Sequence, residues 1–196
     1  REAWADNHLG DRNSLELIGP QNQLAKEILA LGKPVVVLLL NGRPLSVKYL
    51  SENAPALIEG RYLGQETGNA VADVVFGRSN PGGKLPVTIA RDVGQLPMFY
   101  NHKPSARRGY LFAETSPLYP FGYGLSYTSF QYGAPQLSAA TIRGGEGVTV
   151  TVPVTNSGQR AGDDGVPVYL RDNVSSATRP VKELVGFQRI TLQPGE

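Results

Sequence analysis

The stretch PVVVLLLNGRP, residues 34–44, contains the longest apolar run of the chain. Its six consecutive apolar residues, 35–40, have the length of one strand, and no polar residue interrupts them. Such a strand is typical of a parallel sheet that is covered on both faces. The turn residues Asn41, Gly42 and Pro44 then end the run. We therefore expect a parallel strand here with both faces buried.

A helix is predicted immediately upstream of this strand. Pro20 is suited to a helix start, because the missing N–H of proline has no helical partner in the first turn. Leu24, Ile28 and Leu31 follow at the spacing of one helix face, and Gly32 supplies a stop.

Further short elements follow the apolar stretch. Residues 56–58 predict a second strand, and residues 69–76 predict a helix with one apolar side, which Gly77 ends. The alternation of strands and helices predicts a layered α/β sandwich with a mainly parallel sheet. Residues 78–129 combine turn clusters with aromatic side chains, so we expect a long ordered loop there.

From residue 130 onward the apolar pattern has a period of two. Val148 to Val154 place four valines on one face, and the ranges 166–170 and 181–192 alternate in the same way. Three or four strands separated by turns predict a β-sandwich, and a complete one of this type needs about seven strands. The sequence thus predicts two domains, an α/β sandwich with its linker loop at 1–129 and a truncated all-β sandwich at 130–196.

Composition excludes several classes of function. The chain has no Cys and only two His, so thiolate chemistry and a His-rich metal site are not expected. Its net charge of +2 and the absence of a basic stripe argue against nucleic acid as a partner. No run approaches the about 18 apolar residues of a membrane helix. We expect neither a metal nor a cofactor.

Ten phrases occur in a set order along almost the whole chain. They are REAW (1–4), GDR (10–12), KP (33–34), NGRP (41–44), GQETGNA (64–70), VVFG (74–77), NPGGKLP (80–86), QLP (95–97), YPFGYGLSY (119–127) and RPVKELVGF (179–187). Each phrase alone is weak, but their order is specific. The series resembles the C-terminal α/β sandwich domain of glycoside hydrolase family 3, followed by the start of its fibronectin type III-like domain.

The resemblance implies a retaining, exo-acting β-glycosidase that hydrolyses terminal β-linked sugars, a β-glucosidase first and a β-xylosidase second. Such enzymes use two carboxyl groups about 5–5.5 Å apart. In the family, the nucleophilic Asp comes from an N-terminal barrel-like domain that these 196 residues do not include. The implied partners are a β-linked oligosaccharide or glycoside and that barrel domain. We therefore expect the chain alone to be inactive. The resemblance favours a periplasmic or secreted location over the cytoplasm.

The acid/base Glu of the family precedes the Asp-Arg phrase, which places it within residues 1–12. Glu2 is the only Glu in that window and is our candidate. Asp6 is the alternative, with a shorter side chain. A general acid needs a raised pKa, and Trp4 beside Glu2 is a candidate apolar wall or sugar platform.

The two histidines are candidates for binding sugar hydroxyls, because imidazole offers both a donor and an acceptor. The alternative for His8 and for His102 is an ordinary loop histidine with satisfied hydrogen bonds. For Asp11 and Arg12 we expect a structural role, in which the pair holds a loop through charge-assisted hydrogen bonds.

Three other functions remain to be weighed against the enzyme. A non-catalytic carbohydrate-binding or structural module would use the β-sandwich and the aromatic loops without a carboxyl pair. A nucleotide-binding α/β domain would need a glycine-rich turn after the first strand, and Asn41-Gly42-Arg43-Pro44 does not match one. An adhesion segment would not explain the first 129 residues.

Overall fold

A computed structural model describes residues 12–106, 109 and 111–196. The chain divides into two compact units that alternate along the sequence. The first unit comprises residues 1–71, 84–123 and 169–185, and the second comprises residues 72–83, 124–168 and 186–196. Each unit is described separately below.

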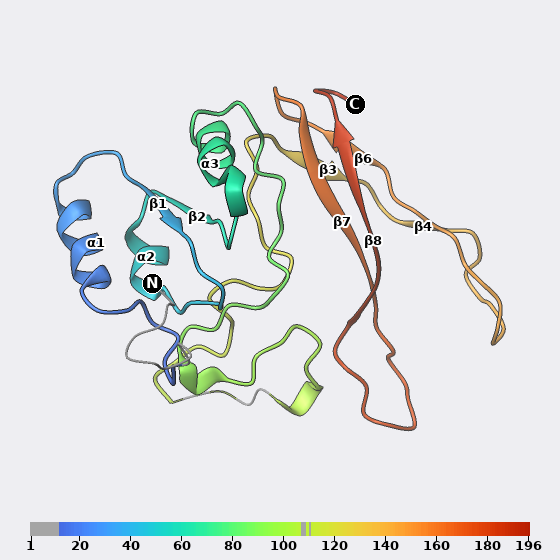
Figure 1. Ribbon diagram of the computed structural model, residues 1–196. Helices are drawn as coiled ribbons and strands as arrows, with labels where there is room; N and C mark the ends of the chain where they lie inside the picture. Colours follow the sequence, from blue (N-terminus) through green and yellow to red (C-terminus); the bar gives the residue numbers. More distant parts are fainter. Residues whose placement is uncertain (1–11, 107–108, 110) are drawn as a thin grey trace. The chain divides into compact units, whose positions relative to one another are not determined.

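The first unit contains an α/β arrangement. Its elements in chain order are α1 (Gln21–Ala30), β1 (Val36–Leu39), α2 (Lys48–Asn53), β2 (Ala56–Glu59), the 3-10 helix η1 (Gly64–Glu66), the start of α3 (Thr67–Val75), and the 3-10 helices η2 (Val93–Gln95) and η3 (Pro104–Ala106). Strands β1 and β2 are parallel neighbours, with α1 and α2 beside β1 (Figure 1). The parallel pairing predicted from the apolar runs is confirmed.

Helix α1 begins and ends where its sequence predicts. Pro20 occupies the position before the first helical residue, and Leu24 N–H donates to its carbonyl at 2.9 Å. Gly32 follows the helix with φ +66°, a left-handed conformation that glycine adopts without steric cost. The predicted cap residues therefore act at both ends.

The prediction that the apolar run is buried on both faces is wrong. Val36 is 50% exposed and Leu40 is 51% exposed, whereas Leu39 is buried. The reason is that β1 has only β2 beside it among the described residues, and the hydrophobic core lies on one side of this pair. That core consists of Leu39, Leu45, Val47 and Leu50.

Helix α2 was not predicted. It is only six residues long, too short for a helical period to stand out in the sequence. Leu50 from this helix is 1% exposed and lies at the centre of the core cluster. Packing of that one side chain therefore accounts for a helix that local pattern does not reveal.

Helix α3 confirms the helix predicted over residues 69–76, within two residues at its start and one at its end. The preceding Glu66 accepts a hydrogen bond of 2.6 Å from Asn69 Nδ2, a contact that supports the first turn. Gly77 ends the segment with φ +72°.

The described residues 130–196 contain six strands in three two-stranded sheets. Strand β3 (Phe130–Tyr132) pairs antiparallel with β6 (Val154–Asn156), and β4 (Gln136–Leu137) pairs antiparallel with β5 (Val150–Thr151). Strand β7 (Gly162–Leu170) pairs with β8 (Glu183–Leu192). The predicted alternation over Val148–Val154 is interrupted, because Pro153 has no N–H and its carbonyl accepts Gly133 N–H at 2.9 Å. The chain thus has an α/β part followed by a β part.

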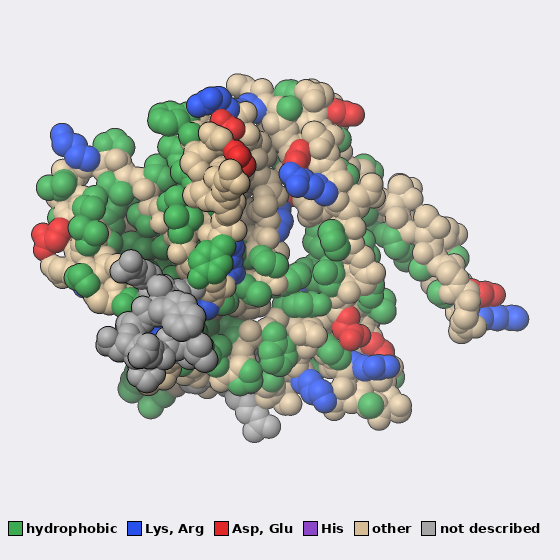
Figure 2. Space-filling model, viewed as in Figure 1, with side chains coloured by type: hydrophobic (Ala, Val, Ile, Leu, Met, Phe, Trp, Pro, Cys, Tyr) green, Lys and Arg blue, Asp and Glu red, His purple; other side chains and the backbone are tan. Residues whose placement is uncertain are grey.

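Hydrophobic side chains are exposed on α1 of the first unit, at the left of Figure 2. Leu24 is 59% exposed and Leu31 is 69% exposed, although both belong to the apolar face that identified the helix. The helical period therefore predicted the element but not the burial of its face.

Candidate functional site

Most of the sequence-predicted site residues lie outside the described part of the chain. These are Glu2, Trp4, Asp6 and His8, together with Asp11. Of the predicted sugar-binding residues, only His102 is described. The described residues that bear on a site are those from Arg12 onward at the loop after β1 and those around His102.

Two residues at the start of the described chain, Arg12 and Leu15, are attached to the loop that follows β1. Arg12 Nη1 donates to the carbonyl of Glu16 at 2.8 Å. The structural role expected for the Asp11–Arg12 pair stays a prediction, because Asp11 lies outside the described residues. Arg43 Nη1 donates to the carbonyl of Arg12 at 3.4 Å, and Ser46 N–H donates to the carbonyl of Leu15 at 2.7 Å. Two backbone carbonyls of this segment are thus held by residues 43–46.

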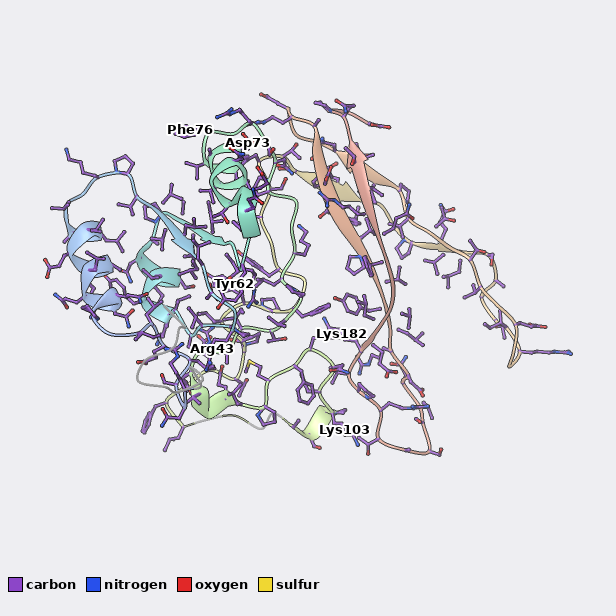
Figure 3. The ribbon with its side chains drawn as sticks, viewed as in Figure 1. Arg43, Tyr62, Asp73, Phe76, Lys103 and Lys182 are labelled. Carbon is purple, nitrogen blue, oxygen red and sulfur yellow. The ribbon has the colours of Figure 1, made fainter. Side chains whose placement is uncertain are left out.

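A polar cluster lies at the carboxyl ends of the two parallel strands. Asn41 is 2% exposed, and its Nδ2 donates to the carbonyl of Arg43 at 2.7 Å. Arg61, which has φ +53°, donates through Nη1 to the carbonyl of Gly42 at 3.3 Å and lies 3.5 Å from Glu59 Oε1 through Nε. Figure 3 labels Arg43 in this region.

Three polar atoms in this region are buried and have no hydrogen-bond partner among residues 12–106, 109 and 111–196. They are Arg12 Nε, Asn41 Oδ1 and Arg61 Nη2. A cavity of about 80 Å³ adjoins the cluster and is lined by Arg12 and Asn41 among others. The carboxyl ends of parallel strands are where α/β sheets place their ligands, and this cluster retains donors and an acceptor there.

His102 lies in a loop and is half-buried. Its Nδ1 lies 3.0 Å from the carbonyl of Lys103, so an Nδ1–H tautomer donates there and leaves Nε2 as an acceptor. Its own carbonyl accepts Val181 N–H at 3.0 Å. The structure shows a hydrogen-bonded loop histidine whose second ring nitrogen remains suited to a sugar hydroxyl.

A larger cavity, of about 430 Å³, lies next to the loop of His102 in the same unit. Phe99, Tyr100, Asn101 and Phe121 contribute to its lining, and Pro44 borders it from the loop after β1. Aromatic walls with an amide group are a common lining for sugar ligands, whose rings have apolar faces and polar edges. Tyr100, Asn101 and Phe121 all belong to the loop predicted over residues 78–129, but the sequence did not identify Phe121 as the neighbour of Tyr100.

The described residues contain no candidate metal site and no helix that could span a membrane. Within residues 12–106, 109 and 111–196, no three His, Cys, Asp or Glu side chains gather in a way that would hold a metal ion. The helices described there are too short to cross a bilayer.

Two family models match the chain. The glycosyl hydrolase family 3 C-terminal domain matches residues 1–127, and a fibronectin type III-like domain matches residues 165–196.

Individual relatives cover nearly the whole chain. A β-xylosidase from Formosa agariphila is 49% identical over 95% of the chain, and a periplasmic β-glucosidase from Salmonella typhimurium is 44% identical over 94%. The structure of a β-glucosidase from Erythrobacter marinus aligns over 99% of the chain with a TM-score of 0.94 and 53% identity. The chain covers 26% of each of these three proteins. Together with the match over residues 1–127, these similarities show that the chain belongs to glycosyl hydrolase family 3 and carries its C-terminal domain.

Proposed function

We propose that the chain is the acid/base side of a retaining, exo-acting β-glycosidase. The observation that carries the proposal is its similarity to a β-xylosidase and to β-glucosidases that are each about four times as long. In this proposal a β-glucosidase is preferred and a β-xylosidase is second. The nucleophilic Asp belongs to the N-terminal barrel domain of the same protein.

The proposed reaction needs one carboxyl group that first donates and then accepts a proton. Glu2 protonates the leaving-group oxygen while the nucleophile forms a glycosyl-enzyme bond, and it then removes a proton from the attacking water. Trp4, His8 and His102 bind the sugar or the leaving group. The attachment of residues 12–15 to the loop after β1 supports this assignment, because it holds one end of the segment that contains Glu2.

The domain organisation is proposed on the same grounds. Residues 1–129 belong to a layered α/β sandwich with a mainly parallel sheet, and residues 130–196 belong to an incomplete fibronectin type III-like sandwich. The family matches at 1–127 and 165–196 support this division. The interleaving of the two compact units is a competing description of the same chain.

The acid/base assignment is tested by Glu2→Ala in the full-length enzyme. For phenyl β-glucoside, which needs protonation to leave, kcat/KM should fall by about 10²–10⁴-fold. For 2,4-dinitrophenyl β-glucoside the loss should be much smaller, because the leaving group is already acidic. Azide should restore turnover of the activated substrate by attacking the glycosyl-enzyme in place of water.

Asp6→Ala is the matched control, and it should lower kcat/KM only slightly and by the same factor for both substrates. Equal losses on both substrates for Glu2→Ala, without azide rescue, would move the role to Asp6 or make Glu2 structural. The pair of variants therefore decides between the two carboxylates.

A further inference from the structure

Residues 169–185 pack against the loop of His102 within one compact unit. These residues form the adjoining ends of β7 and β8 and the connection between them. The fibronectin type III-like match, over 165–196, includes all of them. A segment of that module is thus part of the surroundings of the larger cavity. Figure 3 labels Lys103 and Lys182, which mark the two segments.

Aromatic contacts form the first part of this packing. The ring of Tyr100 stacks on Phe121 at 4.4 Å between centroids, and Tyr169 meets Tyr100 edge-on at 6.0 Å and 65°. Lys182 Nζ lies 4.6 Å from the centroid of the Tyr169 ring. Stacked, edge-to-face and cation–π arrangements of this kind are attractive, so the four side chains support one another.

Two hydrogen bonds form the second part. Val181 N–H donates to the carbonyl of His102 at 3.0 Å, and Leu184 N–H donates to the hydroxyl of Tyr100 at 3.2 Å. Burial, followed by the neighbouring Tyr100, raises the pKa of Tyr169 above its ordinary value. Residues 181–184 therefore hold the loop at two points, the side chain of Tyr100 and the backbone carbonyl of His102.

The held loop is part of the cavity wall. Phe99, Tyr100 and Asn101 line the cavity of about 430 Å³, and Phe121 lies beneath Tyr100 in the same wall. We propose that Tyr169 and Lys182 are positioning residues that hold Tyr100 and His102 in place, so that the fibronectin type III-like module sets the affinity of the enzyme for its glycoside. The kinetic part of this proposal rests on the proposed glycosidase function.

The contact of Tyr169 with Tyr100 is tested first by hydrogen–deuterium exchange of the full-length protein, a measurement that needs no activity assay. Tyr169→Ala should speed exchange in peptides that cover residues 98–104 by about tenfold or more, because the loop opens more readily. Tyr169→Phe keeps the ring and should restore slow exchange. Tyr132→Ala is the control, since it also removes a tyrosine from the β part of the chain, and it should leave exchange in 98–104 unchanged. Unchanged exchange in Tyr169→Ala would overturn the proposal.

Lys182→Met provides a second variant in case Tyr169→Ala does not fold. It keeps the aliphatic stem and removes the cation, so it should speed exchange in 98–104 in the same direction but by less. Exchange in 98–104 at the unmodified rate in this variant would also count against the proposal.

Kinetics then distinguish positioning from simple loss of stability. Tyr169→Ala should raise KM about fivefold while kcat stays within about twofold, because ground-state binding is lost. Combined with His102→Ala, it should lower kcat/KM no further than His102→Ala alone. Additive losses, or a loss of kcat alone, would contradict a role through His102. If the unmodified protein hydrolyses no β-glycoside, the proposed function fails, and the exchange experiment still decides the contact.

Discussion

At the residue scale, Asn156 shows how much one buried polar side chain can connect. It is 0% exposed, and its Oδ1 accepts hydrogen bonds from Thr128 Oγ1 at 2.6 Å and from Gly158 N–H at 3.0 Å. Its Nδ2 donates to the carbonyls of Arg160 at 2.7 Å and Leu192 at 3.0 Å. Its amide therefore joins the ends of β6 and β8 to Thr128 and to the loop at residues 158–160.

We expect Asn156→Ala to lower the free energy of unfolding by about 3 kcal/mol, because several buried groups lose their partners together. Asn53→Ala is the control, since Asn53 is exposed and makes one side-chain hydrogen bond of 2.8 Å, to the carbonyl of Tyr49. Its expected loss is below about 0.5 kcal/mol. Urea denaturation of both variants measures the difference, and similar losses would show that the network of Asn156 is not important for stability.

At the element scale, the ends of the helices depend on glycine conformation. Gly32 has φ +66° after α1, whereas Gly68 lies inside α3 and has no positive φ. A methyl group at either position would meet no atom within 4 Å. The two sites therefore differ in backbone strain and not in available space.

Gly32→Ala should destabilise the protein by about 1 kcal/mol, because a Cβ disfavours the left-handed conformation. Gly68→Ala should instead stabilise it by about 0.5–1 kcal/mol, because alanine loses less entropy in a helix. Thermal unfolding checks both signs. A neutral Gly32→Ala would mean that the end of α1 is not set by this conformation.

At the scale of the whole molecule, the chain holds one side of a proposed two-domain active site. It spans about a quarter of the length of its relatives, and the proposed nucleophile lies outside it. A retaining mechanism needs both carboxyl groups. Residues 1–196 alone should therefore release no nitrophenol from nitrophenyl β-glucoside or β-xyloside, whereas the full-length enzyme should. Measured turnover by the purified 196-residue chain would contradict the proposed division of the site.

The sequence alone was sufficient to predict the elements whose structure depends on residues close together in the chain. The caps at Pro20 and Gly32, the strand at 36–39 and its parallel partner at 56–59 were all predictable, because turn chemistry and apolar periodicity are local properties. The family followed from the order of short phrases along the chain, whereas the window of the acid/base Glu stays a prediction.

Tertiary packing decided the features that join distant residues. The helix around Leu50 exists because that side chain enters the core, and Val36 is exposed because β1 is covered on one side only. The contact of Tyr169 with Tyr100 joins the fibronectin type III-like match to the loop of His102, and no local pattern in either segment encodes it. Such contacts depend on which surfaces meet after folding, and this is why the sequence predicted the long loop at 78–129 but not the segment that packs against it.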